Sequence, residues 1–116
     1  MLVLILELSK TDNLGIYALR TTIYQGSTII NLCDIELIGR ILKQDKVVIE
    51  ITKQYFQQEV IGDYKARQLL QLCSIANLVG KGIVRSALDL RLAKEDSIKK
   101  IAGVPFLMIY KFGLKY

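Results

Sequence analysis

The chain of 116 residues is 52% apolar and 23% charged, with a formal net charge of +5. This composition is globular rather than disordered, and we expect a single domain, 1–116, built around one core. Because the chain contains no histidine, a Ser-His-Asp or Cys-His catalytic site, an imidazole acid or base and a histidine-based zinc site are all excluded.

The N-terminal stretch "MLVLILELSK" is apolar, but no basic residue precedes it and Glu7 interrupts it after six residues. We therefore interpret it as a first strand over 2–8, buried on both faces, and not as a signal peptide. No other apolar run approaches the roughly twenty residues that cross a bilayer, so we expect a cytoplasmic protein without a membrane partner. Cys33 and Cys73 are too few for a disulfide framework and are expected to be reduced and buried.

The next segments alternate between strand and helix patterns. β-Branched and aromatic residues over 16–24 and 28–32, separated by "QGS", predict two strands of a meander. The period then changes, and Asp34 is placed to cap a short helix. Its apolar residues at helical spacing are Leu37, Ile38, Ile41 and Leu42. "KVVIEIT" predicts another strand, and 54–61 is either a short strand or an irregular arm.

From Gly62 onward the pattern is helical. Asp63 is a candidate N-cap of a first helix, whose inward stripe is Ala66, Leu69, Leu70 and Cys73. A second helix is predicted over 80–92 and a short third one over 95–102, ended by Gly103 and Pro105. In the second helix Lys81, Arg85 and Asp89 fall on one outward line.

The last predicted element is a strand that begins at Pro105, with Phe106, Met108, Tyr110 and Phe112 on one face. Strands first, helices next and one returning strand predict an α+β fold. We expect a small mixed or antiparallel sheet with about three helices packed on one of its faces.

The charges are unevenly distributed along the chain. Residues 1–63 carry six Lys/Arg against eight Asp/Glu, whereas residues 64–116 carry ten against three. Such a basic half indicates a polyanionic partner such as RNA or the ribosome, although it is also compatible with a solvated basic surface. The candidate phosphate contacts are Lys81, Arg85, Arg91, Lys94, Lys99, Lys100, Lys111 and Lys115.

The Gly80-Lys81-Gly82 triplet stands where the second predicted helix begins. Free backbone N–H groups and the helix dipole at such a place favour an anion. The nucleoside-triphosphate loop pattern fails, because Ile75 and Gly82 stand where it needs a glycine and a Ser or Thr. The alternative is that the glycines only allow a tight bend or close helix packing.

The chain resembles the archaeal family named domain of unknown function 424 in the order and separation of three segments. These are "CDIELIGR" at 33–40, "IANLVGKGIV" at 75–84 and "IAGVP" at 101–105. The resemblance implies an archaeal, cytosolic α+β protein. Where the family commonly continues Gly-Val-Pro with His-Ala-Gln, this chain has 106–108 as Phe-Leu-Met, so any chemistry of that histidine is absent here.

Two other clusters carry side chains with chemical potential. Cys33, Asp34 and Glu36 could act on a substrate or hold a divalent cation, but nearby carboxylates keep a thiol protonated. We favour a structural interpretation, with Asp34 as a helix cap, Glu36 as an acid in the first turn and Cys33 as a small core residue. We expect no metal and no cofactor. The tail "YKFGLKY" interleaves rings and lysines as single-stranded RNA binding requires, yet alternation puts Tyr110 with Phe106 and favours core packing.

These observations leave three hypotheses. The first is an RNA- or ribosome-associated module that binds phosphates through its basic second half. The second is a protein-interaction or homo-oligomeric module without enzymatic activity, based on the high apolar fraction. The third is a small enzyme that uses Asp34, Glu36 or Glu59 with a divalent ion. No small-molecule substrate is evident.

Overall fold

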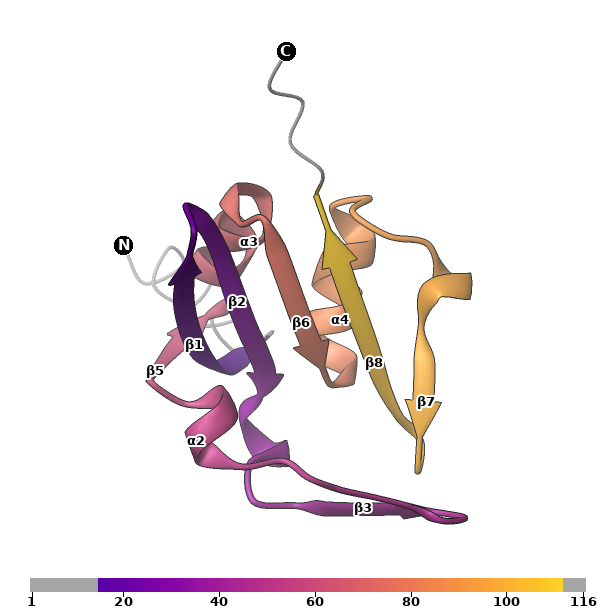
Figure 1. Ribbon diagram of the computed structural model, residues 1–116. Helices are drawn as coiled ribbons and strands as arrows, with labels where there is room; N and C mark the ends of the chain where they lie inside the picture. Colours follow the sequence, from indigo (N-terminus) through magenta and orange to yellow (C-terminus); the bar gives the residue numbers. More distant parts are fainter. Residues whose placement is uncertain (1–14, 112–116) are drawn as a thin grey trace, which may run out of the picture.

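The structure is a computed structural model and describes residues 15–111. Its centre is a six-stranded sheet with the strand order β5-β1-β2-β6-β8-β7 (Figure 1). The strands are β1 (Ile16–Tyr24), β2 (Ser27–Asp34), β5 (Glu59–Gly62), β6 (Ile75–Val79), β7 (Lys99–Ile101) and β8 (Val104–Tyr110). Only the β2–β6 pair among these is parallel, so the sheet is mixed. The predicted α+β fold class is confirmed.

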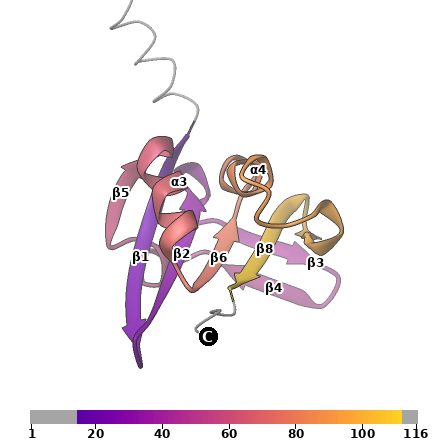
Figure 2. The ribbon, with the colours of Figure 1, turned by 90° about the horizontal axis from the view of Figure 1, so that it is seen from above.

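The two faces of the sheet are covered differently. α3 (Asp63–Leu72) and α4 (Lys81–Asp89) pack side by side on one face, whereas the hairpin of β3 (Ile41–Gln44) and β4 (Val47–Glu50) lies beneath the other (Figure 2). The one-turn helix α2 (Lys53–Phe56) also lies on the hairpin side, and the Thr52 hydroxyl caps it by accepting a hydrogen bond from Tyr55 N at 3.2 Å. No helix within residues 15–111 has the length and apolar character needed to span a membrane.

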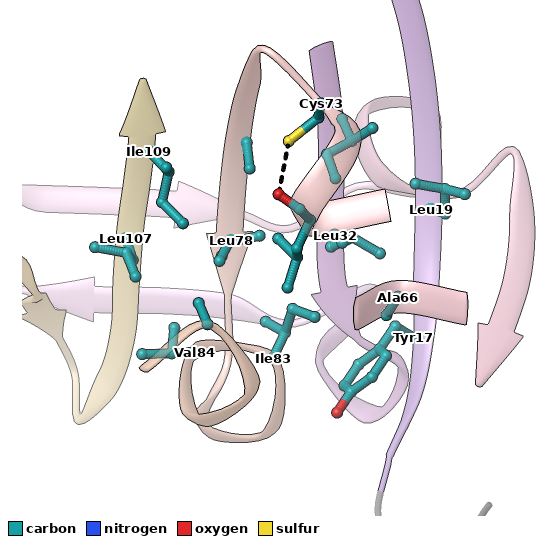
Figure 3. Close-up of a cluster of buried hydrophobic side chains, with 14 of the residues drawn as sticks. Tyr17, Leu19, Leu32, Ala66, Cys73, Leu78, Ile83, Val84, Leu107 and Ile109 are labelled. Carbon is teal, nitrogen blue, oxygen red and sulfur yellow. Dashed lines mark hydrogen bonds between the residues drawn. The ribbon is translucent and has the colours of Figure 1, made fainter. Parts of the chain in front are cut away.

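The main core lies between the sheet and the helices α3 and α4 (Figure 3). Its side chains come from alternate positions of the strands, such as Leu19 of β1, Leu32 of β2 and Leu78 of β6, and all three are at most 1% exposed. Ile83 of α4 and Leu70 of α3 close the core from the helix side. Burial of such side chains contributes about 1.5–3 kcal/mol each, which explains why this face has a fixed register.

A second, smaller cluster lies on the opposite face of the sheet. Leu42 and Ile51, from the hairpin region, and Phe56 of α2 pack there against sheet residues such as Cys33 and Val79. This cluster covers only the half of the face next to the carboxyl end of β2, where the hairpin begins. The other half of that face is covered only in part, by α2: Asn31 is buried there, whereas Met108 and Tyr110 are exposed.

Two of the helix predictions, the helix after Asp34 and the helix over 95–102, are wrong. After Asp34 only one 3₁₀ turn forms, Ile35–Leu37, because Gly39 adopts φ +90° and donates its N–H to Ile51 O; the chain then runs into β3. After the second 3₁₀ turn, Glu95–Ser97, the chain enters β7.

The end of the third predicted helix is a hairpin. Ala102 and Gly103 both have positive φ, as a two-residue hairpin turn between β7 and β8 requires, so Gly103 serves that turn and not a helix end.

Three further expectations concern strands. The strand β6 was not predicted, although it is central in the sheet. β8 was predicted, but the prediction of which of its side chains face the core was wrong. Leu107 and Ile109 enter the main core, while Met108 and Tyr110 are each 54% exposed on the opposite side. The predicted strand over 2–8 lies outside the described residues.

Candidate functional site

The Gly80-Lys81-Gly82 turn connects β6 to α4, and a carboxylate from a neighbouring strand closes it. Asp34 ends β2, which pairs in parallel with β6, so its side chain reaches the beginning of α4. Asp34 Oδ2 accepts a hydrogen bond from Gly82 N at 2.8 Å, and Oδ1 accepts one from Ile83 N at 2.9 Å. Asp34 therefore caps α4, 47 positions further along the chain, and makes no side-chain cap for the turn that follows it.

The two glycines are explained by the close approach of this carboxylate. Gly80 has φ +119°, and a Cβ there would lie 2.4 Å from Asp34 Cγ. At Gly82 a Cβ would lie 3.1 Å from Asp34 Oδ1. Because Gly80 N also donates to Pro105 O and Gly82 N to Asp34, an anion at this turn could rely only on the remaining donors and on the Lys81 side chain. The predicted anion-binding role of the turn stays a prediction.

The acidic-thiol cluster is arranged as a structural element. Burial, followed by the charges of Asp34 and Glu36, raises the pKa of Cys33 to about 12, so the thiol stays protonated near neutral pH. Burial also raises the pKa of Asp34, while the hydrogen bonds from Gly82 and Ile83 partly oppose that shift. Within residues 15–111, no three Cys, Asp or Glu side chains are grouped closely enough to hold a metal ion.

Glu59, the third acid of the enzyme hypothesis, is in another part of the sheet. It lies in β5, where it pairs with Leu19 of β1 and forms a 3.5 Å ion pair with Lys65. β1 therefore separates it from Asp34 and Glu36 at the end of β2, and these acids do not form one site.

The three sequence segments quoted above, 33–40, 75–84 and 101–105, meet around one cavity of about 360 Å³. Its lining includes Asp34, Glu36, Arg40, Lys81, Gly103 and Pro105. A second hollow of about 370 Å³ adjoins it at Lys81 and Pro105, and there Arg85 and Lys100 join Lys81 beside the acids Asp89 and Glu95. Segments that are far apart in the chain thus build one continuous surface.

Four cations on this surface form what we term the Lys81 surface: Arg40, Lys81, Arg85 and Lys100. All four are exposed. The ion pairs found among residues 15–111 involve Lys65 and Arg67 and none of these four. A lysine in the first turn of a helix opposes the helix dipole, so helix stability does not explain Lys81.

The structure separates the other predicted phosphate contacts from this surface. Lys99 lies beside Phe106 on the opposite face of the sheet, and the ammonium group of Lys111 donates to the Leu70 carbonyl at the end of α3. Arg91 and Lys94 are exposed in the segment after α4, and Lys115 lies outside the described residues. Arg40 was missed; its presence in the "CDIELIGR" segment was the available signal.

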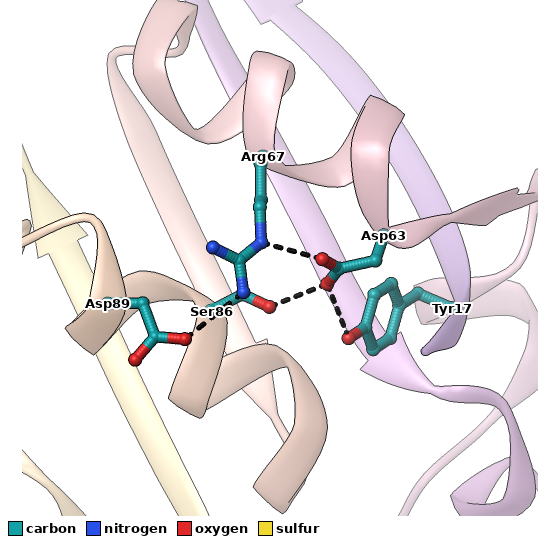
Figure 4. Close-up of polar contacts among 5 residues, drawn as sticks. All are labelled: Tyr17, Asp63, Arg67, Ser86 and Asp89. Carbon is teal, nitrogen blue, oxygen red and sulfur yellow. Dashed lines mark hydrogen bonds and ion pairs between the residues drawn. The ribbon is translucent and has the colours of Figure 1, made fainter. Parts of the chain in front are cut away.

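A polar cluster centred on the buried Asp63 carboxylate holds α4 in place (Figure 4). Asp63 Oδ1 accepts hydrogen bonds from the Tyr17 hydroxyl at 2.9 Å and from Ser86 Oγ at 2.6 Å. Asp63 Oδ2 accepts one from Arg67 Nε at 2.6 Å, and Arg67 also reaches Asp89 at 3.1 Å. This cluster joins β1, α3 and α4, so the positions of Lys81 and Arg85 are fixed from within.

Asp63 remains ionised in this cluster despite its burial. Burial alone would raise the pKa of Asp63, but the hydrogen bonds from Ser86, Tyr17 and Arg67, together with the Arg67 charge, lower it below its ordinary value. Asp63 was predicted as an N-cap; it is instead the first residue of α3, and its side chain caps nothing.

These features define a small α+β protein with a six-stranded mixed sheet, two helices on one face and, at the carboxyl ends of its parallel strand pair, a surface with four exposed cations. Residues 22–112 match the family model described as "Protein of unknown function (DUF424)", and the chain belongs to this family. A comparison with curated proteins finds no match.

Among solved structures, the chain is similar to the crystal structure of an uncharacterized conserved protein from Methanopyrus kandleri. The two share 23% sequence identity and superpose with a TM-score of 0.69, over 83% of this chain and 91% of the other. At this level of identity the likeness shows the fold.

Proposed function

We propose that the protein binds RNA through the phosphates, using the Lys81 surface, and that it does so in the cytoplasm of an archaeal cell, near the translation apparatus. One observation carries the proposal: Arg40, Lys81, Arg85 and Lys100 come from three distant segments, gather around two adjoining hollows and have no ion-pair partner within residues 15–111. Unpaired cations that are clustered on a fixed scaffold attract a polyanion and release its counterions on binding.

The carboxylates in these hollows limit the strength of the interaction. Asp34, Glu36, Asp89 and Glu95 line the same hollows, so the carboxylates equal the four cations in number. We therefore expect contacts between side-chain charges and phosphates, with a steep dependence on salt and little sequence preference.

The test compares two variants with the same net charge. One replaces Lys81, Arg85 and Lys100 with glutamine; the control replaces Lys43, Lys46 and Lys53, which are exposed in the hairpin and in α2. Binding of total tRNA is measured by filter retention between about 50 and about 200 mM salt. We expect only the first variant to lose affinity and to reduce the slope of log K against log salt by about 2. Equal losses in both variants, or no binding by the wild type, would overturn the proposal.

A second candidate function is association with another protein or with a second copy of the chain. The hairpin supports it, because Ile41, Val47 and Val48 are 56%, 46% and 63% exposed on a two-stranded sheet that stands apart from the main sheet. Light scattering over a concentration series tests the homo-oligomeric version. A mass that stays at one chain throughout would refute that version.

A further inference from the structure

The partly covered half of the sheet, on the face away from α3 and α4, presents an ordered row of side chains. Arg20, Asn31, Asn77 and Met108 are cross-strand neighbours in β1, β2, β6 and β8, so they run in one line across the sheet. A parallel row consists of Thr22, Ile29, Ile75 and Tyr110. The first row therefore has two asparagine amides, which we term the amide row, between the cation of Arg20 and the thioether of Met108. The rows that face the helices are instead aliphatic.

Two hollows lie on this face and meet at Tyr55 and Asn77. The first, of about 450 Å³, is lined by Tyr55, Phe56, Asn77, Lys99, Phe106 and Met108, among others. The second, of about 440 Å³, is lined by residues that include Arg20, Thr22, Asn31, Gln54, Tyr55 and Asn77. Neither hollow is lined by a carboxylate, and each has one cation. Each hollow therefore offers one positive charge, and no negative one, to a ligand.

Tyr55 stands between the two hollows as an accessible ring. It is 55% exposed, and its ring meets the buried ring of Phe56 edge-on with a centroid separation of 4.9 Å. The backbone of Tyr55 is also held, because Asn31 Nδ2 donates to its carbonyl at 3.1 Å. A fixed and exposed ring can stack on a planar group at little cost in conformational entropy.

The amide row ends in an acceptor without a partner. Since the Tyr55 carbonyl can only accept, Asn31 must donate through Nδ2, which leaves Asn31 Oδ1 to accept from Asn77 Nδ2 at 2.8 Å. Asn77 Oδ1 is then the buried side-chain oxygen without a hydrogen-bond partner among residues 15–111. Buried polar atoms are rarely left unpaired, and an N–H donor from a ligand would satisfy this one.

We infer that this face binds two consecutive unpaired nucleotides of a single-stranded RNA. Tyr55 stacks on a base, Asn77 Oδ1 accepts a base N–H, and Lys99 and Arg20 contact the phosphates on either side. This combination of rings, amides and cations is the one that single-stranded nucleic acids require. A peptide that adds to a sheet pairs with an edge strand, whereas the strand residues that line the two hollows belong, apart from Lys99 of β7, to the interior strands.

The inference rests on the proposed function for the class of ligand, but it uses a different surface, lined by none of the four cations of the Lys81 surface. The two can therefore fail separately. If only the variant with glutamine at Lys81, Arg85 and Lys100 loses affinity for RNA, the sheet face is not the site for unpaired nucleotides. If only a sheet-face variant loses single strands, the Lys81 surface is not the RNA site.

The experiment measures binding of fluorescein-labelled hexauridylate and hexaadenylate by fluorescence anisotropy at low salt. Tyr55→Ala is compared with Tyr64→Ala, which removes an even more exposed ring (71% against 55%) from α3, on the helix side. We expect Tyr55→Ala to weaken binding of a single strand roughly 5- to 100-fold, while Tyr64→Ala leaves it unchanged. Lys99→Gln, at another exposed position, should also weaken it, and circular dichroism verifies that each variant is folded.

Three results would overturn the inference. One is the same affinity for Tyr55→Ala and Tyr64→Ala. Another is equal binding of a duplex of the same length, because a duplex exposes no base face. The third is equal binding of an acidic hexapeptide, which would assign the face to a protein partner. Photocrosslinking with a 4-thiouridine-containing hexamer gives an independent result: the adducts should lie on the peptides that contain Tyr55 or Met108.

Discussion

Replacing Gly80 with alanine tests whether the Asp34 carboxylate holds the start of α4. A Cβ at this position would lie 2.4 Å from Asp34 Cγ, more than about 1 Å inside the normal separation of two carbon atoms. The φ of +119° adds backbone strain of about 1–3 kcal/mol for any residue other than glycine. Moving the carboxylate away weakens two hydrogen bonds to a charged group, each worth about 1.5–3 kcal/mol. We expect a total loss of about 4 kcal/mol or more.

Two other glycines serve as controls, because each isolates one part of this cost. Gly103 has φ +81° but no atom within 4 Å of a new Cβ, so Gly103→Ala should cost only the strain of about 1–2 kcal/mol. A Cβ at Gly82 would lie 3.1 Å from Asp34 Oδ1, and Gly82 has no positive φ. In Gly82→Ala the cost of this contact is therefore offset by a gain in helix propensity of up to about 1 kcal/mol.

Urea unfolding followed by circular dichroism gives the free energy of unfolding of each variant. The m-value should stay constant, since the surface exposed on unfolding does not change. If Gly80→Ala costs no more than Gly103→Ala, the clash with Asp34 is not real and the proposed cap is wrong.

Two further predictions concern buried ionisable groups. The pKa of Asp63 is lowered from 3.8, so its contribution to stability is present above pH 3.8 and is lost as the pH falls through the folded-state value. When the urea midpoint is plotted against pH, Asp63→Asn should therefore reduce the loss of stability at acid pH. Asp89→Asn leaves Asp63 and its other partners in place and should show the same acid loss as the wild type. Cys33 and Cys73 are 0% and 4% exposed, and both have raised pKa values. Ellman's reagent at pH 8 should therefore modify neither thiol in the folded protein and both in urea. Rapid reaction of Cys33 in the folded protein would contradict its burial.

The local patterns predicted the elements whose structure is decided locally. β1 and β2 flank a two-residue turn, Gln25–Gly26, in which both residues have positive φ, and β-branched and aromatic residues are frequent on both sides of this turn in the sequence. α3 and α4 each carry an apolar stripe at helical spacing. The strands β3 and β7 are four and three residues long, too short for a period of two to be told from a helical one.

The site depended on a pairing that no local pattern reveals. β6 is a short, almost wholly apolar strand directly before α4, and its parallel pairing with β2 brings Asp34 and Arg40 to Lys81. Asp34 was correctly interpreted as a helix cap, but for the wrong helix, because capping rules consider only the residues that follow. Lys81, Arg85 and Lys100 could be predicted as exposed cations; Arg40 could be placed with them only once β6 was known.

The Asp34 cap also determines what kind of binding the Lys81 surface can support. Because the carboxylate already occupies the N–H groups of Gly82 and Ile83, the turn lacks the ring of free backbone donors that holds a phosphate in a fixed orientation. What it exposes is the flexible side chain of Lys81, a point charge that contacts phosphates without orienting them. On the proposed RNA-binding function, any selectivity for particular nucleotides would therefore have to come from elsewhere on the molecule. The sheet face on the hairpin side is suited to that task, since the Tyr55 ring packs edge-on against Phe56 and the Asn77 side chain is held by its hydrogen bond to Asn31.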